Sequence, residues 1–257
     1  KTVTTALSGT PDASRPFEAV YSVLQGVTAT KYAIKINNTE YSYTTTGTAS
    51  TYDATNITTQ IFNAISGLSG FTVTNLGTHI YISNSSDFTI QAIDGYGSEG
   101  SQVLKGSAQN FTDLPNTAVN GMVIEITNDA GNSFDNYYVK YESDSTSDTG
   151  VWVETVKPAL KNSINTSTFP HLLIRTADGN FRYTEANGST YTISGVTYTV
   201  PLWGSRVAGD ESSSEDPSFI GRAITDIFFH RNRLGFLAAE TIFMSRSGEF
   251  FELYPET

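Results

Sequence analysis

Alternating apolar and polar residues predict short strands along most of the chain. From Tyr32, every second residue of KYAIKI is apolar, and the same period returns in YSYT after the polar segment NNTE. A period of two is the spacing of one face of a strand, and Asn-rich segments form tight turns. The pattern therefore predicts a β-hairpin at this point of the chain.

One stretch has helical spacing instead. Ile57, Ile61 and Ile65 recur in DATNITTQIFNAISGL, with Asp53 or Thr55 in position to cap the start and glycines near the end. Three strand-like runs follow, FTVTNL, HIYIS and FTIQAID. Residues 1–20 contain SGTPDASRP and are predicted to be an irregular lead. Together these features predict that residues 1–110 form an α+β region.

Residues 111–205 show strand patterns and turns. The strand-like runs begin at Val123 and continue through YYVKY, GVWVETV, HLLIRTA, NFRYTEA, STYTIS and TYTVPLW. Regular short strands separated by Asp-Gly, Asn-Gly and Ser-Gly turns are typical of antiparallel sheets. We therefore expect a mostly β protein with a small α+β part. Its antiparallel sheets form a sandwich, a barrel or a propeller-blade-like meander, and one short helix is present.

The third predicted region, residues 206–257, opens within the acidic segment WGSRVAGDESSSEDPSF, which we expect to be an exposed loop. Four apolar runs come next, ITDIFFH, RLGFLAA, TIFMSRS and EFFELYP, and predict a blade-like β meander that is incomplete at the C-terminus. Its Phe residues are expected in the core. His230, Arg231, Arg233 and Arg246 are expected at strand ends, where they pair with acidic neighbours or another chain.

Composition excludes several classes of chemistry. A chain of 257 residues with 38% hydrophobic residues can bury a sizeable core, as one large or two modest domains. With no Cys, it has no disulfides, no thiolate catalysis and no Cys-ligated zinc. No apolar run has the length of a membrane span. Because Met122 and Met244 are the two methionines, we expect the sequence to be an internal piece of a longer protein.

The net charge of −11 disfavours tight binding of nucleic acid. The three regions have five basic against seven acidic residues, five against ten, and five against nine, so none is net basic. An acidic surface would suit a protein that lets DNA pass without holding it, because like charges repel within about a Debye length, roughly 10 Å.

Six sequence blocks resemble a known family. They are FTDLPNTAVNGMVIEI, DNYYVKYES, GVWVETVKPAL, FPHLLIRTADGNFRY, DPSFIGRAITDIFFHRNRLGFLA and MSRSGEFFELYP. In this order and spacing they resemble tail tubular protein B, the nozzle protein of short-tailed bacteriophages, from about Phe111 to Thr257. The earlier residues resemble it loosely, through KYAIKINNTEYSY and HIYIS.

This resemblance implies a structural virion protein located in the tail. Copies would form a ring of six below the tail adaptor ring, in contact with that protein and other tail proteins, and duplex DNA would pass through the ring without tight binding. The family supplies no catalytic residue, cofactor or metal ligand to transfer. The structural or subunit-contact candidates are Trp152, Arg231, Arg233 and Arg246.

The alternative is a polysaccharide-binding or polysaccharide-hydrolysing tail module. A glycosidase needs two carboxylates about 5 to 9.5 Å apart, and the candidates are Asp135, Glu142, Glu154 and Asp178. Tyr-rich strands such as STYTISGVTYTV could stack on sugars, although Tyr is also ordinary in strands. For nucleophilic hydrolysis, the possible bases are His79, His171 and His230, but the sequence has no G-x-S-x-G motif.

Two loops have residue types that bind ligands in other proteins, but the spacing of these residues does not favour a binding site. NDAGNSFDN places Asn128, Asp129, Asn132 and Asp135 together, but it lacks the spacing and terminal Glu of an EF-hand. We interpret it as a solvated hairpin loop. DGYGSEG contains Gly95, Gly97 and Gly100, but it does not open a helix within a βαβ unit. We interpret it as a Gly-rich turn.

Overall fold

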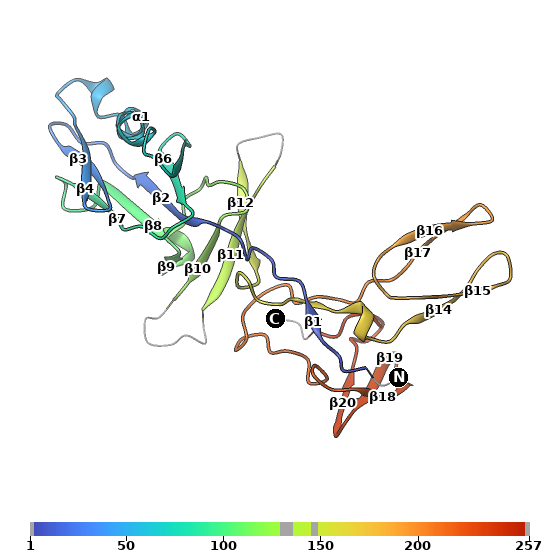
Figure 1. Ribbon diagram of the computed structural model, residues 1–257. Helices are drawn as coiled ribbons and strands as arrows, with labels where there is room; N and C mark the ends of the chain where they lie inside the picture. Colours follow the sequence, from blue (N-terminus) through green and yellow to red (C-terminus); the bar gives the residue numbers. More distant parts are fainter. Residues whose placement is uncertain (1–2, 129–135, 145–148, 255–257) are drawn as a thin grey trace. The chain divides into compact units, whose positions relative to one another are not determined.

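The computed structural model describes residues 3–128, 136–144 and 149–254, and its chain divides into two compact units (Figure 1). The sheet unit is Ser14–Thr155, and the hairpin unit combines Lys1–Ala13 with Val156–Thr257. The sheet unit is thus an insertion in the sequence of the hairpin unit. Strands dominate both, and α1 (Ala54–Ile65) is the α-helix of the described residues. The prediction of a mostly β fold with antiparallel sheets and one short helix is confirmed.

The sheet unit contains an eight-stranded sheet and a three-stranded sheet. In spatial order, the larger sheet consists of β12 (Gly150–Thr155), β11 (Tyr137–Ser143), β10 (Val123–Ile126), β9 (Ser107–Ala108), β8 (Ser101–Lys105), β2 (Phe17–Val23), β6 (His79–Asn84) and β5 (Phe71–Asn75). The smaller sheet consists of β4 (Thr39–Thr44), β3 (Lys31–Ile36) and β7 (Ile90–Asp94). All neighbours are antiparallel except β9 and β10.

Helix α1 is fixed by its cap and by its apolar face. The Asp53 carboxylate accepts a hydrogen bond from Asn56 N at 3.1 Å, which satisfies a backbone donor at the helix start. Ile57, Ile61 and Ile65 are fully buried in one core cluster with residues of β2, β3 and β6. Each buried Ile side chain contributes about 1.5 to 3 kcal/mol relative to exposure. The predicted helix and the Asp53 cap are confirmed.

The hairpin β3–β4 also follows the sequence prediction. Its two-residue turn places Asn37 and Asn38 at φ 46° and 68°, in the left-handed region. Asn tolerates this conformation better than most residues, and such turns match the twist of paired strands. The described residues also form short 3₁₀ helices at η1 (Ala49–Thr51), η2 (Phe111–Asp113) and η4 (Thr166–Thr168).

Strand β2 shows where the predicted irregular lead was wrong. Phe17 begins a seven-residue strand that pairs with β6 on one side and β8 on the other. Six of its seven residues are buried. Ala19, Tyr21 and Val23 lie on one face, which packs in the core cluster with α1, and Val20 interrupts the alternation because the opposite face packs in a second core cluster.

The hairpin unit contains four small antiparallel sheets. They pair β1 (Leu7–Ser8) with β13 (Ser163–Ile164), β14 (Leu172–Arg175) with β15 (Phe181–Thr184), β16 (Thr190–Ile193) with β17 (Val196–Thr199), and β18 (Ile224–His230) with β19 (Arg233–Ala238) and β20 (Thr241–Met244). The predicted fourth run of the meander was wrong. Residues 249–254 fold back at Gly248, whose φ is 84°, and Arg246 N donates to Glu252 O at 3.0 Å.

An aromatic cluster forms the core of the hairpin unit. The Phe169 ring lies 4.7 Å from Trp203, 5.0 Å from Phe219 and 5.4 Å from Phe236, measured between ring centroids. Such pairs contribute about 0.5 to 1.5 kcal/mol beyond the area that they bury. Trp203 and Phe219 are the ends of the segment predicted as an exposed acidic loop, so that prediction was wrong for its termini.

The three predicted regions, 1–110, 111–205 and 206–257, stay a prediction. The two units group residues by contact, and the eight-stranded sheet takes strands from both sides of residue 110. Among the described residues, no helix is long and apolar enough to cross a membrane.

Candidate subunit-contact surfaces

Trp152 connects the edge strand β12 to the rest of the sheet unit. Its ring meets Tyr141 of β11 edge to face, with 5.3 Å between centroids, and its Nε1 donates to Pro115 O at 2.8 Å. Val151 and Val153 point to the opposite face and are 63% and 40% exposed. Trp152 therefore has a structural role within the unit, and its part in a subunit contact stays a prediction.

Arg231 lies in the tight turn between β18 and β19, and Arg233 begins β19. Arg231 and Asn232 adopt φ 45° and 60°, and both arginines are exposed. The Arg233 Nη1 donates to Ser245 O at 3.0 Å. Their positions at strand ends agree with the prediction, whereas a carboxylate partner within the fold or on another subunit stays a prediction.

Replacing both Arg231 and Arg233 with alanine is expected to change the free energy of unfolding by less than about 1 kcal/mol, because exposed charges contribute little. We also expect unchanged affinity for duplex DNA. Thermal unfolding and a fluorescence anisotropy titration check the two statements. A variant that keeps its melting temperature but loses measurable DNA binding would identify a phosphate-binding site at this turn.

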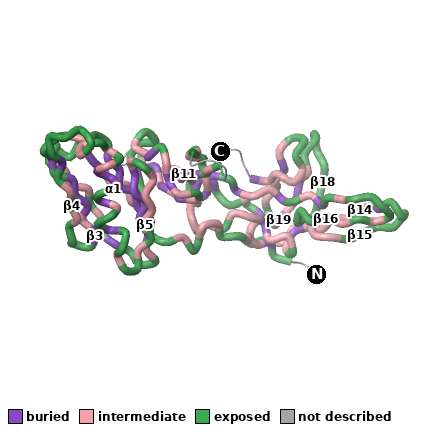
Figure 2. Tube along the Cα trace, turned by 90° about the horizontal axis from the view of Figure 1, so that it is seen from above, coloured by how far each residue is buried: buried purple, intermediate pink, exposed green. Residues whose placement is uncertain are grey.

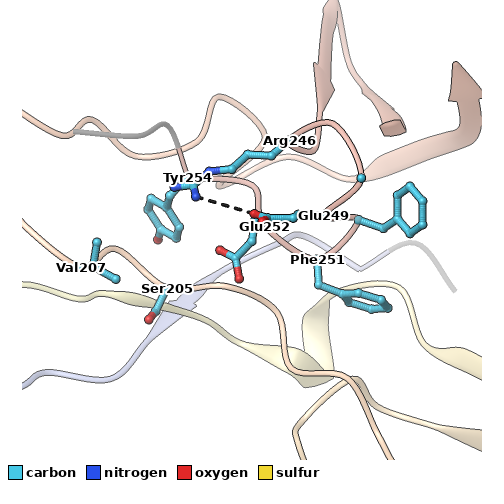
Figure 3. A pocket seen from close by; sticks show the side chains of 9 residues that line it. Ser205, Val207, Arg246, Glu249, Phe251, Glu252 and Tyr254 are labelled. Atoms are coloured by element: carbon cyan, nitrogen blue, oxygen red, sulfur yellow. Dashed lines mark ion pairs between the residues drawn. The ribbon is translucent and has the colours of Figure 1, made fainter. Parts of the chain in front are cut away.

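Arg246 lines an open pocket of about 580 Å³ in the hairpin unit (Figure 3). The pocket is bounded by Ser205, Val207 and residues of the segment 246–254. Arg246 forms an ion pair with Glu249 at 3.7 Å, and Glu252 supplies a second carboxylate. Two carboxylates beside one guanidinium favour a cationic group of a partner over an anionic one.

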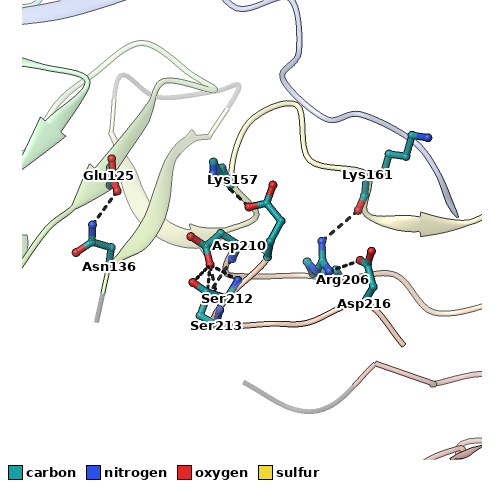
Figure 4. A network of polar contacts seen from close by, with 10 residues as sticks. Glu125, Asn136, Lys157, Lys161, Arg206, Asp210, Ser212, Ser213 and Asp216 are labelled. Atoms are coloured by element: carbon teal, nitrogen blue, oxygen red, sulfur yellow. Dashed lines mark hydrogen bonds and ion pairs between the residues drawn. The ribbon is translucent and has the colours of Figure 1, made fainter. Parts of the chain in front are cut away.

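Arg206 anchors the loop next to this pocket (Figure 4). Arg206 is 1% exposed. Its Nη2 lies 2.6 Å from Asp216 Oδ1, and its Nη1 donates a hydrogen bond to Lys161 O at 3.2 Å. The guanidinium also lies 5.6 Å from the centroid of the Tyr254 ring. Sequence reasoning missed this residue, because an Arg among acidic residues in a polar segment is normally exposed.

Asp210 orders the next part of the same loop. Burial acts to raise the pKa of Asp210, but hydrogen bonds from Ser212 and Ser213 outweigh this effect and lower the pKa to about 2. The backbone N–H groups of Ser212 and Ser213 donate to its Oδ1 at 2.9 and 3.0 Å. The Asp210 carboxylate thus stabilises this turn.

Several strands of the hairpin unit carry exposed residues (Figure 2), and some of these residues are apolar. The expectation that the Phe residues of the meander are core holds for Phe236, which is fully buried, and is wrong for Phe229, which is 62% exposed. The exposed apolar residues on these strands are Leu173, Phe181, Tyr183, Val196, Ile227, Phe229, Ile242 and Met244. Leu173 and Tyr183 are cross-strand partners in the β14–β15 ladder, so apolar exposure is contiguous there, and contiguous apolar surface marks contact sites for other proteins.

Glu142 and Glu154, the candidate glycosidase carboxylates described in the sheet unit, do not face each other. Glu142 lies opposite Val151 in the β11–β12 ladder, whereas Glu154 lies opposite Val139. Because alternate residues point to opposite faces of a sheet, Glu142 and Glu154 are on different faces. Asp178 belongs to the other unit, where it accepts a hydrogen bond from Thr176 Oγ1 in the β14–β15 turn. Asp135 lies outside the described residues.

His79 forms a buried polar network rather than an accessible base. Its Nδ1 lies 2.9 Å from Ser22 Oγ and its Nε2 lies 2.8 Å from Asn116 Oδ1. The ring is 8% exposed and Ser22 is 1% exposed, so a polymeric substrate cannot reach either group. His171 stacks on Tyr183 with 5.0 Å between centroids, and His230 ends β18 on the surface.

Acidification is expected to destabilise the sheet unit through His79. Burial lowers the pKa of His79 below 6.5, so the unfolded chain binds a proton at a higher pH than the folded chain. Stability then falls as pH drops through the unfolded pKa, by at most about 1.4 kcal/mol per pH unit. Urea unfolding of His79→Gln should show a weaker pH dependence, with His230→Gln as the control. An unchanged dependence in His79→Gln would contradict this assignment.

Most of the Asn128–Asp135 loop, including Asp129 and Asn132, lies outside the described residues. Within the described ranges, no group of three or more His, Asp and Glu residues could hold a metal ion. In the Gly95–Gly100 turn, the Asp94 carboxylate accepts from Tyr96 N at 2.9 Å and from Ser101 N at 3.0 Å, and the turn leads into strand β8. Asp94 therefore orders a turn between strands, as the sequence indicates.

The chain consists of two β units, and apolar residues are exposed on strands of the hairpin unit. The chain matches the bacteriophage nozzle proteins over residues 1–257, and it belongs to that family of structural tail proteins. It is also 36% identical over 162 residues to the tail tubular protein gp12 of Escherichia phage T7. This match covers 63% of the chain and 18% of the relative's length. The chain is accordingly a component of the virion tail.

Proposed function

We propose that this chain forms part of the wall of a tail nozzle, in which a ring of six copies surrounds the channel for genome ejection. The observation that carries the proposal is the family match over the whole chain. Exposed apolar residues on the strands of the hairpin unit support it, because a wall segment needs surfaces for neighbouring copies and for the adaptor ring. We further propose that the chain has no hydrolytic activity.

The net charge of −11 supports passage of DNA without tight binding. Each phosphate contact made by Lys or Arg would add a counterion-release contribution to binding, and an acidic wall avoids such contacts. This account requires that acidic residues face the channel. A high net charge also keeps proteins soluble, so net charge alone does not identify a channel wall. The position of the acidic residues relative to the channel decides between the two explanations.

Labelling of virions tests the proposal. Antibody fragments against the exposed β14–β15 hairpin should decorate the nozzle of the tail in electron micrographs, at positions that repeat around its axis. Fragments against an unrelated capsid protein provide the control. Decoration of the capsid or of tail fibres, with none on the nozzle, would contradict the proposed location.

A further inference from the structure

The two edges of the eight-stranded sheet carry backbone groups that no described residue binds. β12 pairs with β11 alone at one edge, and β5 pairs with β6 alone at the other. An unpaired edge is a template for a further strand, because its N–H and C=O groups point outward in a regular row.

The pairing pattern identifies the outward groups of β12. Asp144 N donates to Thr149 O at 3.2 Å, which marks these residues as a hydrogen-bonded pair at the start of the ladder. Hydrogen-bonded and non-hydrogen-bonded pairs alternate along an antiparallel ladder. The N–H and C=O of Val151 and Val153 therefore face β11, whereas those of Trp152 and Glu154 face away from the sheet.

The outward backbone groups of β5 follow from the same alternation of pairs. Leu76 N donates to His79 O at 2.8 Å, which fixes the alternation in the β5–β6 ladder. The backbone groups of Val73 and Asn75 consequently face away from β6. Each edge thus offers outward donors and acceptors on two residues that are two positions apart.

Neither edge carries the features that usually prevent pairing. The β5 sequence FTVTN has no charge and no Pro, and the β12 sequence GVWVET has a single acid, Glu154. Natural edge strands are commonly protected by Lys, Pro or bulges. Because copies of a chain with net charge −11 repel each other, contact between copies is favoured where charges are sparse.

We propose that β5 of one copy pairs with β12 of the next copy, so that their eight-stranded sheets join edge to edge. The proposal rests on the proposed ring. A contact between these two different edges is head-to-tail, and it closes into a ring where the rotation between copies divides a full turn evenly. A contact of one strand pair buries less than the roughly 1,000 Å² of a stable interface. The isolated chain is therefore a 27.9 kDa monomer at micromolar concentration and associates as the concentration rises.

Proline substitutions test the contact with little effect on the ladder. Glu154→Pro removes an outward N–H of β12, and Asn75→Pro removes one of β5, positions at which an edge strand tolerates Pro. Sedimentation velocity from micromolar to millimolar concentration should show association of the unaltered chain and of the controls Glu154→Ala and Asn75→Ala. Each Pro variant alone should stay monomeric. An equimolar mixture of the two should form a dimer, because each supplies the edge that the other lacks.

Circular dichroism establishes that each variant is folded, and Val153→Lys blocks the β12 edge with a charge if Glu154→Pro does not fold. If Glu154→Pro or Val153→Lys associated as strongly as the unaltered chain, the proposed edge pairing would be wrong. The proposed ring would not be affected by that result. Dimers of Asn75→Pro alone would indicate symmetric β12 pairing and overturn the head-to-tail contact. An unaltered chain that stays monomeric at millimolar concentration would contradict both the edge pairing and a ring contact within this chain.

Discussion

Replacing Arg206 with alanine is expected to lower the free energy of unfolding of the hairpin unit by about 2 to 3 kcal/mol, through lost packing and a lost buried hydrogen bond. The ion pair itself contributes little, because the Asp216 side chain is 51% exposed. The side chain is almost completely buried, and it connects Asp216 with the carbonyl of Lys161. These segments are far apart in sequence and meet at this guanidinium. Its removal leaves the Lys161 carbonyl without this donor and opens a void beside the Tyr254 ring.

The ion pair of Lys157 with Glu211 provides the matched control for Arg206. Its atoms are 3.2 Å apart, but the two side chains are 41% and 62% exposed. Lys157→Ala should therefore cost less than about 1 kcal/mol. Urea unfolding of both variants measures the difference. Equal losses in Arg206→Ala and Lys157→Ala would show that Arg206 does not anchor the loop.

Phe219→Ala is expected to have the largest effect among single substitutions in the hairpin unit, about 4 kcal/mol. Phe219 is fully buried, and its ring stacks on Phe243 with 4.1 Å between centroids and lies 5.0 Å from Phe169. Truncation removes apolar contacts and leaves a cavity that neighbouring rings cannot fill completely.

Phe229→Ala is the control for this prediction. The Phe229 side chain is 62% exposed, and we expect its truncation to change stability by about 0.5 kcal/mol or less. Thermal unfolding of the two variants under one set of conditions compares them directly. If Phe229→Ala destabilised the chain as much as Phe219→Ala, the assignment of core and surface in this unit would be wrong.

Local sequence patterns predicted the elements whose structure depends on near neighbours. The turn Asn37–Asn38 and the apolar face of α1 follow from backbone preference and from a regular period. The strands of the β14–β15 and β16–β17 hairpins were predicted for the same reason, since their polar and apolar residues alternate.

Features that depend on distant residues could not be predicted. β2 is central in its sheet because β6 and β8 cover both edges, and nothing within its own sequence states this. Arg206 is buried because three remote segments converge on it. The separation of Glu142 and Glu154 onto opposite faces follows from the ladder register, which a list of acidic residues does not contain.

A cryo-EM reconstruction of the intact tail tests the proposed nozzle function most directly. The account predicts six copies of this chain around the channel, with β5 of each copy beside β12 of the next and with acidic residues on the channel surface. A map that places the chain outside the ring, or that shows a predominantly basic channel surface with the acidic residues confined to the outer face, would contradict it.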